Sequence, residues 1–289
     1  MRSLLFVPAD GGAKLDKAMA SGADAVIIDL EDSITTERKE GARAACLDFL
    51  KANAAKKERP RLLVRINGFD TGMTDADLDV IVAGKPDAVV FPKAEGGPSA
   101  VHLDAKLTAR EAVAGLTEGS IKVLAQAVES AAGLFLAGTF KDSSKRLIGM
   151  TWGPEDLSAE LGAEANRDEH GLLTEPYRLA RNICLYGAAV AKIPAIETVY
   201  VDFRNSEGLR RDTEAARRDG FTGRLAIHPA QVPIINEVFT PTAEQIEKAK
   251  AIIAAFAANP GAGAIGLDGK MFDRPHLVRA QALLARASS

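Results

Sequence analysis

The sequence predicts an α/β protein with one (β/α)8 TIM barrel and a C-terminal helical extension. Its 289 residues suffice for the roughly 250 that such a barrel needs, plus a tail. Hydrophobic residues make up 47% and charged residues 26%, so a large core can form without disulfides. Short apolar runs alternate with helical patterns eight times along the chain, which indicates βα units around a parallel sheet.

The eight apolar runs are the expected strands, and several are unbroken Val, Ile and Leu stretches typical of strands covered on both faces. They are Ser3–Pro8, Ala25–Asp29, Leu62–Ile66, Ala88–Pro92, Ile121–Ala127, Leu147–Thr151, Thr198–Phe203 and Arg224–His228. An open doubly wound sheet usually stops at about five or six strands. Eight strands therefore favour closure into a barrel.

Helical patterns lie between and after these runs, and they include Thr36–Leu50, Thr74–Val82, Pro176–Ala191 and Thr242–Ala258. We therefore assign residues 1–258 to the barrel, which is the expected catalytic domain. A Gly/Ala-rich loop follows, and Asp268–Ala287 resumes a helical pattern with an apolar stripe. We expect residues 259–289 to form a C-terminal loop and helix that pack on another surface, either this barrel or a neighbouring subunit.

Composition excludes several classes of partner. The net charge is −3 and the Lys and Arg residues form no stripe, so we expect no nucleic-acid partner. No apolar run approaches the ~18 residues of a membrane span, and the first residues resemble a strand more than a signal peptide. Cys46 and Cys184 have no ligand-like spacing and fit buried thiols in a reducing compartment. We expect a cytoplasmic protein.

Acidic residues follow two adjacent strands at the end of the barrel where active sites lie. Glu129 comes after the fifth strand and Asp156 after the sixth. Magnesium binds oxygen ligands and commonly takes one or two carboxylates, with water and substrate in its other positions. We therefore predict that Glu129 and Asp156 hold Mg2+. The alternative is that each acid only complements the dipole of the helix that it precedes or begins.

Other charged residues at strand ends have candidate roles around this metal. Asp29, Glu31 and Asp32 could be further ligands, acceptors that orient the ligands, or partners of Lys93 and Arg65. We favour a supporting shell that also includes Lys93. The Arg65 guanidinium could grip a substrate carboxylate by two parallel bonds, or form a structural ion pair with Asp29 or Glu31.

Histidine chemistry has little support in the sequence. His228 ends a strand and could be a base or a packed side chain. No His spacing suggests zinc.

A set of motifs in a fixed order resembles the citrate lyase beta-subunit-like family of the HpcH/HpaI aldolase superfamily. The motifs span almost the whole chain: Leu4-Leu5-Phe6-Val7-Pro8, Asp29-Leu30-Glu31-Asp32, Val64-Arg65-Ile66-Asn67, Phe91-Pro92-Lys93, Val128-Glu129-Ser130-Ala131-Ala132-Gly133, Gly153-Pro154-Glu155-Asp156-Leu157, Ala226-Ile227-His228-Pro229-Ala230-Gln231 and Asp268-Gly269-Lys270-Met271-Phe272-Asp273. Two departures are Ser130, where relatives often carry Thr, and Ser33-Ile34, where Ala-Val is usual. Neither departure removes a ligand.

The resemblance implies a Mg2+-dependent carbon–carbon lyase, commonly a homotrimer. Its substrate would be a 3-hydroxy-carboxyacyl-CoA thioester of the citramalyl, malyl or citryl type, split into a keto acid and an acyl-CoA. Carried over by position, Glu129 and Asp156 would hold the metal, and Arg65 and Glu129 would bind the substrate. Asp273 would be the catalytic acid that relatives supply from the C-terminal segment, often into a neighbouring subunit.

Several related activities fit the same residues. One is a malyl-CoA thioesterase or a malate-synthase-like enzyme. Another is an aldolase that releases pyruvate without CoA. A third is a subunit that is active only within a citrate lyase complex. The sequence leaves the acyl part, the carrier and the direction of reaction open.

Overall fold

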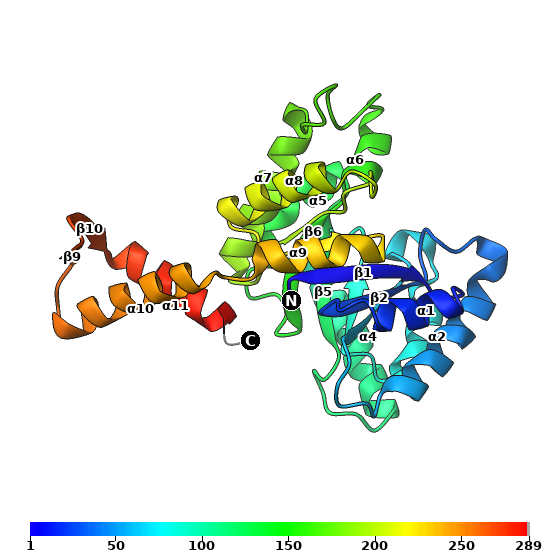
Figure 1. The fold of residues 1–289 in the computed structure, drawn as a ribbon. Coiled ribbons are helices and arrows are strands. Elements are labelled where there is room, and N and C mark those ends of the chain that lie inside the picture. Colours follow the sequence, from blue (N-terminus) through cyan, green and yellow to red (C-terminus); the bar gives the residue numbers. More distant parts are fainter. Residues whose placement is uncertain (288–289) are drawn as a thin grey trace. The chain divides into compact units, whose positions relative to one another are not determined.

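The computed structural model describes residues 1–287, which form two compact units (Figure 1). The first unit is Met1–Asn236 and the second begins at Glu237. The helix that covers residues 243–258 therefore belongs to the second unit, whereas the sequence-based division placed it with the barrel. That division remains a prediction. No helix within residues 1–287 combines the length and the apolar character needed to cross a membrane.

Eight parallel strands form the sheet of the first unit. They are β1 Ser3–Pro8, β2 Ala25–Asp29, β3 Arg61–Arg65, β4 Ala88–Phe91, β5 Lys122–Val128, β6 Leu147–Trp152, β7 Ile196–Glu197 and β8 Gly223–Ala226. Their order is β6-β5-β4-β3-β2-β1-β8-β7, and a parallel bridge between Met150 and Ala195 connects the two ends. The nearly closed sheet confirms the predicted barrel.

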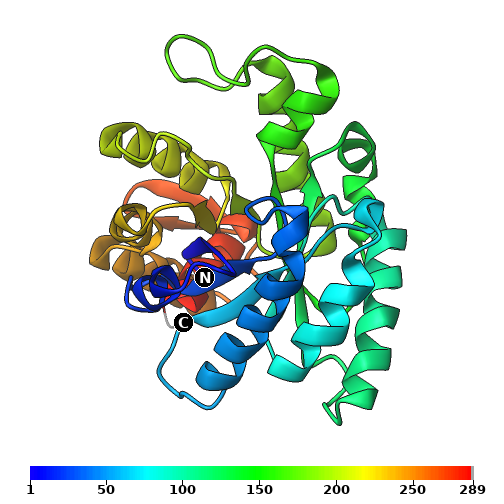
Figure 2. The ribbon, with the colours of Figure 1, turned by 90° about the vertical axis from the view of Figure 1, so that its right-hand side faces the viewer.

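Helices follow the strands and lie outside them, as the blue to green helices show in Figure 2. They are α1 Ala13–Met19, α2 Lys39–Asn53, α3 Thr74–Ile81, α4 Gly96–Val113, α5 Ala131–Leu136, α6 Pro154–Leu161, α7 Glu175–Ala191, α8 Ser206–Asp219 and α9 Val232–Phe239. Short 3-10 turns are η1 Thr36–Arg38, η2 Phe69–Thr71, η3 Val82–Gly84, η4 Ala137–Phe140 and η5 Pro229–Gln231. Each strand thus leads into its helix through a loop at one end of the barrel.

Small and branched apolar side chains fill the inside of the barrel. The inner cluster takes alternate residues from its strands, such as Ala25 and Ile27 of β2 or Ala88 and Val90 of β4. This alternation matches the two-residue period of a strand. Because the interior is packed, a ligand can reach the barrel only at the ends of its strands.

The predicted seventh strand is wrong. The sequence placed it at Thr198–Phe203, but β7 is Ile196–Glu197 and the apolar run follows it. Val201 is 54% exposed and Phe203 is 42% exposed, so these side chains are not part of the core. Phe203 instead stacks on His228, with ring centroids 4.8 Å apart. The apolar run that we assigned to the seventh strand is therefore the loop that follows β7.

The second unit contains α10 Ala243–Ala258, a hairpin of β9 Ala264–Leu267 and β10 Lys270–Asp273, and α11 Arg274–Ala287. The sequence predicted both helical segments, but it treated the hairpin region as loop and helix. Asp268 and Gly269 form the turn with φ values of 51° and 71°. An Asp-Gly pair is a strong signal for such a turn. The hairpin and the two helices share one small apolar core, which includes Phe256, Ile265 and Phe272.

Candidate active site

A cavity of about 440 Å3 lies at the C-terminal ends of the strands. Residues from or just after β1, β2, β3, β5, β6, β7 and β8 line it: Phe6, Val7, Pro8, Asp29, Asp32, Ser33, Arg65, Gln126, Glu129, Trp152, Gly153, Pro154, Glu155, Asp156, Thr198, Val199, Leu225 and Ile227. The predicted Asp29, Asp32, Arg65, Glu129 and Asp156 are therefore brought together in one place.

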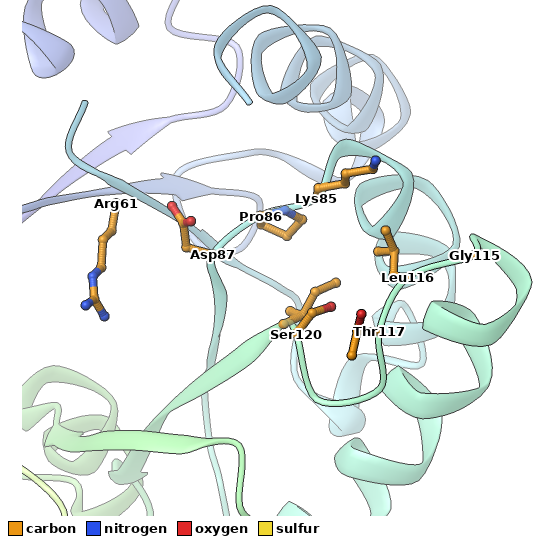
Figure 3. A pocket seen from close by; sticks show the side chains of 9 residues that line it. Arg61, Lys85, Pro86, Asp87, Gly115, Leu116, Thr117 and Ser120 are labelled. Atoms are coloured by element: carbon orange, nitrogen blue, oxygen red, sulfur yellow. The ribbon is translucent and has the colours of Figure 1, made fainter. Parts of the chain in front are cut away.

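A larger cavity, about 570 Å3, lies at the opposite ends of three strands (Figure 3). Its walls are Arg61, Lys85, Pro86, Asp87, Gly115, Leu116, Thr117, Ser120 and Ile121. Asp87 is already paired with Arg59 at 2.5 Å. In barrels of this kind the N-terminal ends serve stability and the C-terminal ends carry chemistry. The smaller cavity is therefore the candidate active site.

Glu129 is buried directly after β5 and is only 3% exposed. Its carboxylate accepts hydrogen bonds from the Lys93 backbone N–H at 2.8 Å and from the Gln126 side-chain amide. Burial, together with the nearby Glu31 and Asp156, raises the pKa of Glu129 to about 8, against the opposing effects of the Lys93 amide and the Arg65 charge. Both of these donors are uncharged amides, so a positive ion beside Glu129 would favour its charged form.

Glycine at position 153 makes room for this carboxylate. A Cβ at Gly153 would lie 2.5 Å from Glu129 Oε1 and 3.1 Å from its Cγ. Gly153 has φ −134°, a conformation that any residue adopts, so the space and not the backbone requires glycine. The end of β6 is thus shaped around the side chain that follows β5.

Asp156 lies in the first turn of α6, and its side chain is 34% exposed on the cavity wall. Its Oδ1 is 3.4 Å from the Lys93 ammonium. The helix N-terminus favours a negative charge there, so the alternative role that the sequence left open is compatible with this position. Asp156 and Glu129 nevertheless face one cavity from adjacent strands, as a two-carboxylate metal site requires.

Arg65 ends β3 and contacts the acidic turn after β2. Its Nε and Nη2 donate to the two carboxylate oxygens of Asp29, each at 2.7 Å, and Nη1 is 2.9 Å from Glu31. The ion pair that the sequence offered as an alternative is therefore present. Arg65 also lines the cavity, with its side chain 11% exposed. Although burial raises the pKa of Asp29, the hydrogen bonds from Arg65 lower it below its usual value overall.

Lys93 connects the acidic turn with the two predicted metal ligands. Its Nζ donates to Glu31 at 2.9 Å and reaches Asp156 at 3.4 Å, while its backbone N–H contacts Glu129. The residue has φ 47°, an uncommon conformation for a side chain other than glycine, which aims both groups at the site. Burial lowers the pKa of Lys93, but the hydrogen bond and charge of Glu31 raise it overall.

The predicted supporting residues differ in burial. Glu31 is 4% exposed, and burial raises its pKa to about 7. The Asp32 side chain is 59% exposed and lies 3.4 Å from Arg65. Asp29, Glu31 and Lys93 are therefore the closely packed members of this shell, and Asp32 lies at its solvent edge.

The donor set fits a divalent cation bound mainly by water and substrate. Of the described residues that line the cavity, five are acidic and one, Arg65, is basic. Gln126 Oε1 is buried beside Glu129 without a hydrogen-bond partner within residues 1–287. That part of the chain contains no group of three His, Cys, Asp or Glu side chains arranged for a metal. A site with two carboxylates suits Mg2+ and not zinc.

Two residues of this cavity were missed by sequence reasoning. Gln126 is a polar residue within the apolar run of β5, which was an available signal. Trp152 ends β6 and is fully buried, and its indole N–H donates to Glu197 at 2.6 Å. No spacing in the sequence relates Trp152 to Glu197, because 45 residues separate them.

The remaining predicted residues lie elsewhere. Asp273 is in the second unit at the end of β10, and its carboxylate contacts the His276 ring. This contact lowers the pKa of Asp273. His228 is exposed; its Nδ1 accepts from the Ala230 N–H at 3.2 Å and its ring stacks on Phe203, so this histidine caps the turn that begins η5.

Comparisons with known proteins agree with this architecture. The model of the family described as HpcH/HpaI aldolase/citrate lyase matches residues 2–229. The chain is 32% identical over 290 residues to citrate lyase subunit beta of Leuconostoc mesenteroides, covering 100% of this chain and 93% of that protein. It is 36% identical over 290 residues to a (3S)-malyl-CoA thioesterase of Cereibacter sphaeroides, covering 100% and 95%.

A solved structure is similar over the same length. CitE from Mycobacterium tuberculosis, in complex with magnesium, acetoacetate and coenzyme A, superposes with a TM-score of 0.78 at 30% identity. The match covers 100% of this chain and 98% of that one.

Proposed function

Since this chain belongs to the HpcH/HpaI aldolase/citrate lyase family, we propose that it is a Mg2+-dependent carbon–carbon lyase. Its substrate is a 3-hydroxy-carboxyacyl-CoA thioester of the citramalyl, malyl or citryl type, and its products are a keto acid and an acyl-CoA. The observation that carries this proposal is the meeting of Glu129, Asp156 and Arg65 in one cavity at the strand ends. The magnesium and coenzyme A in the M. tuberculosis CitE structure support it.

Glu129 and Asp156 would hold Mg2+ between the ends of β5 and β6. When bound there, the metal supplies a positive charge that lowers the pKa of the substrate's 3-hydroxyl and offsets the negative charge that develops on its oxygen. Glu129 contributes a buried carboxylate and Asp156 a half-exposed one. Lys93 keeps both carboxylates in place through the contacts described above.

Arg65 would bind the substrate carboxylate next to the reacting carbon. Its guanidinium is fixed by Asp29 and Glu31 and packs 4.8 Å from the Phe6 ring centroid. A fixed guanidinium loses little freedom when it binds a further carboxylate. Loss of the substrate's hydroxyl proton to water then allows the bond between the hydroxyl-bearing carbon and the α-carbon to break, which leaves a carbonyl group on one product and a thioester enolate on the other.

Asp273 would donate the proton that converts this enolate into the acyl-CoA. In the condensing direction the same carboxylate would take the α-proton. The proton-donating role rests on the family resemblance, whereas the His276 contact, which lowers the pKa of Asp273, favours the proton-accepting form used in the condensing direction. The homotrimer and the cytoplasmic location also remain predictions.

A thioesterase is the second candidate, because the (3S)-malyl-CoA thioesterases are 36% identical to this chain over its whole length. In that reaction, water would cleave the thioester and leave the hydroxy acid intact. A citrate lyase subunit that needs its complex is the third, supported by the citrate lyase beta subunits at 32% and 35% identity.

One experiment separates these candidates. Citryl-, citramalyl-, malyl- and methylmalyl-CoA are incubated with the protein, with and without Mg2+, and the products are identified by mass spectrometry. Mg2+-dependent release of a keto acid and an acyl-CoA establishes the lyase, and Glu129→Ala should abolish it. Free CoA with an intact hydroxy acid identifies the thioesterase.

If none of the four esters reacts, the chain is neither a CoA-dependent lyase nor a thioesterase that works alone. The CoA-free pyruvate aldolase and the complex-bound subunit would then be tested, the first with free hydroxy-keto acids and the second with partner subunits added.

A further inference from the structure

Lys39 is a buried lysine beneath the acidic turn that follows β2. It is the first residue of α2 and is only 7% exposed. Its ammonium donates three hydrogen bonds, to the Leu30 carbonyl at 2.7 Å, to the Glu31 carbonyl at 2.7 Å and to Asn67 Oδ1 at 2.8 Å. Because an ammonium has three N–H groups, all of its donors are used.

The Asn67 side of this contact is part of a wider buried network. Asn67 follows β3, and its side-chain amide donates to the Leu30 carbonyl at 3.1 Å and to Asp77 at 2.7 Å. The other Asp77 oxygen accepts from Arg43 of α2 at 2.6 Å. Lys39 therefore fastens the ends of β2 and β3 to helices α2 and α3, which lie outside the barrel.

The Glu31 side of the contact leads to the active site. Lys39 holds the Glu31 backbone carbonyl, while the Glu31 carboxylate contacts Arg65 and Lys93, each at 2.9 Å. Lys93 in turn reaches Glu129 through its backbone and Asp156 through its ammonium. Four direct contacts thus connect Lys39 with both predicted metal ligands.

We propose that Lys39 is a positioning residue of the active site, which acts through Glu31 to hold Arg65 and Lys93 in place. The inference rests on the proposed function, because Arg65, Glu129 and Asp156 have their roles from it. Lys39 does not line the cavity and would not touch the substrate. Its effect on the reaction is therefore an effect on the geometry of the groups that do.

The geometry explains why a lysine suits this position. The two carbonyls of Leu30 and Glu31 and the Asn67 amide oxygen converge on one point. A compact ammonium satisfies three acceptors that converge, whereas a planar guanidinium spreads its donors. Without the ammonium, the Leu30 carbonyl keeps only the Asn67 amide and the Glu31 carbonyl keeps only the Ile34 N–H, so the turn loses its link to the start of α2.

The test is a double-mutant cycle with Lys39→Met and Glu31→Gln. Lys39→Met should lower kcat/KM by about 10- to 100-fold, the usual effect of removing a residue that orients metal ligands. When Lys39→Met is added to Glu31→Gln, kcat/KM should fall by less than about twofold more. The reason is that Glu31→Gln has already removed the carboxylate through which Lys39 acts on Arg65 and Lys93. A merely structural role of Lys39 would give the same loss in both backgrounds and overturn the proposal.

Arg146→Met is the matched control. Arg146 is also a buried cation, 2% exposed, but it pairs with Glu111 and Asp104 at the start of β6. This variant should lose stability and keep its kcat/KM. If Lys39→Met does not fold, Lys39→Arg replaces it in the cycle, since it keeps the charge and the donors. Lys39→Arg should lower kcat/KM less than Lys39→Met would, and again less in the presence of Glu31→Gln than in its absence. An equal decrease with and without Glu31→Gln contradicts the proposal.

Crystal structures of the Lys39 variant make the inference independent of the assay. The Glu31–Lys93 contact of 2.9 Å should open, and Arg65 should lose its contact with Glu31. If the wild type shows no activity, the proposed function fails, and Lys39 is judged on these contacts alone. An unchanged position of Glu31 in the variant overturns the proposal.

Discussion

Burial affects the charges of Glu129 and Arg65 differently, because the two side chains have different partners. Arg65 is surrounded by carboxylates, with two contacts to Asp29 at 2.7 Å and one to Glu31 at 2.9 Å. Glu129 receives only amide N–H groups, from Lys93 and Gln126, and burial raises its pKa to about 8. A cation bound in the cavity would therefore stabilise Glu129 far more than it would stabilise Asp29, which already has its partner.

Replacing Arg65 with Lys tests the proposed carboxylate clamp. An ammonium cannot make two parallel bonds to Asp29 and also reach Glu31 and the substrate. Loss of one charged hydrogen bond, worth roughly 1.5–3 kcal/mol, corresponds to about a 10- to 100-fold lower kcat/KM for the best ester. Steady-state kinetics would show this mainly as a higher KM. Equal kinetic constants for Arg65→Lys and wild type would remove Arg65 from substrate binding.

Asp273→Asn should abolish turnover while Mg2+ binding survives. A missing general acid typically lowers kcat by about 100- to 10,000-fold. Calorimetry would follow Mg2+ binding, and product formation would follow turnover. Asp268→Asn, at the turn of the same hairpin, is the control and should remain active, because Asn tolerates the positive φ of that position. Normal turnover by Asp273→Asn would exclude this residue from the mechanism.

Part of the candidate site could be predicted from the sequence because the active sites of such barrels lie at the C-terminal ends of the strands. Arg65, Glu129 and Asp156 each follow an apolar run within a few residues, so their positions could be read along the chain. Lys39 could not be found in this way, since its ammonium acts on carbonyls eight and nine residues earlier. Its side chain resembles that of any surface lysine until the fold is known.

Strands β5 and β6 differ from the others because the residues after both contribute to one carboxylate pair. The close approach of Gly153 to Glu129 shows that these two strand ends are fitted to each other. At the other side of the barrel, β7 is only two residues long. Its apolar continuation misled the sequence-based assignment, because pattern alone does not separate a short buried strand from an apolar loop.

Gly153→Ala should impair metal binding with little loss of stability. The added Cβ would meet the end of the flexible Glu129 side chain, 2.5 Å from Oε1, so Glu129 would move while the backbone stays unstrained. We expect about a tenfold weaker affinity for Mg2+ in calorimetry. Gly41→Ala, whose Cβ would meet nothing within 4 Å, is the control. Equal Mg2+ affinities of both variants would contradict the proposed role of Glu129.

The whole barrel has the candidate active site at one end of its strands and a structural charge cluster at the other. Glu111 is fully buried and accepts from Arg146 through both oxygens, at 2.8 Å each, and from the Ile121 N–H at 2.8 Å. Burial alone would raise the pKa of Glu111, but these hydrogen bonds lower it to about 2. The cluster ties α4 to the beginnings of β5 and β6.

Acid should therefore destabilise the molecule through Glu111. A carboxyl whose pKa is lower in the folded chain than in the unfolded one adds stability above about pH 4.5, and this stability is lost as the pH falls toward about 2. Thermal unfolding of wild type and Glu111→Gln between pH 6 and pH 2 would show it. Wild type should be clearly more stable at pH 6, and the difference should shrink on acidification. A difference that does not change with pH would contradict the shifted pKa.

The overall fold was predictable because eight βα repeats leave few arrangements of a parallel sheet other than a barrel. The hairpin of β9 and β10 was missed because its Gly/Ala-rich sequence resembles a loop, although Asp268 and Gly269 form a recognisable turn. The separate second unit was not predicted because it depends on the packing of α10 against α11. The order of apolar and polar residues within one helix does not specify its packing partner.

Trp152 gives the cavity an optical signal of its own. It is the only tryptophan in the sequence, and its fully buried indole ring lines the cavity while its N–H contacts Glu197. Indole emission depends on the polarity and charge of its surroundings, so a ligand or ion entering the cavity changes it directly. With excitation selective for tryptophan, the emission wavelength and intensity of this one indole therefore report occupancy of the candidate site in the unlabelled protein.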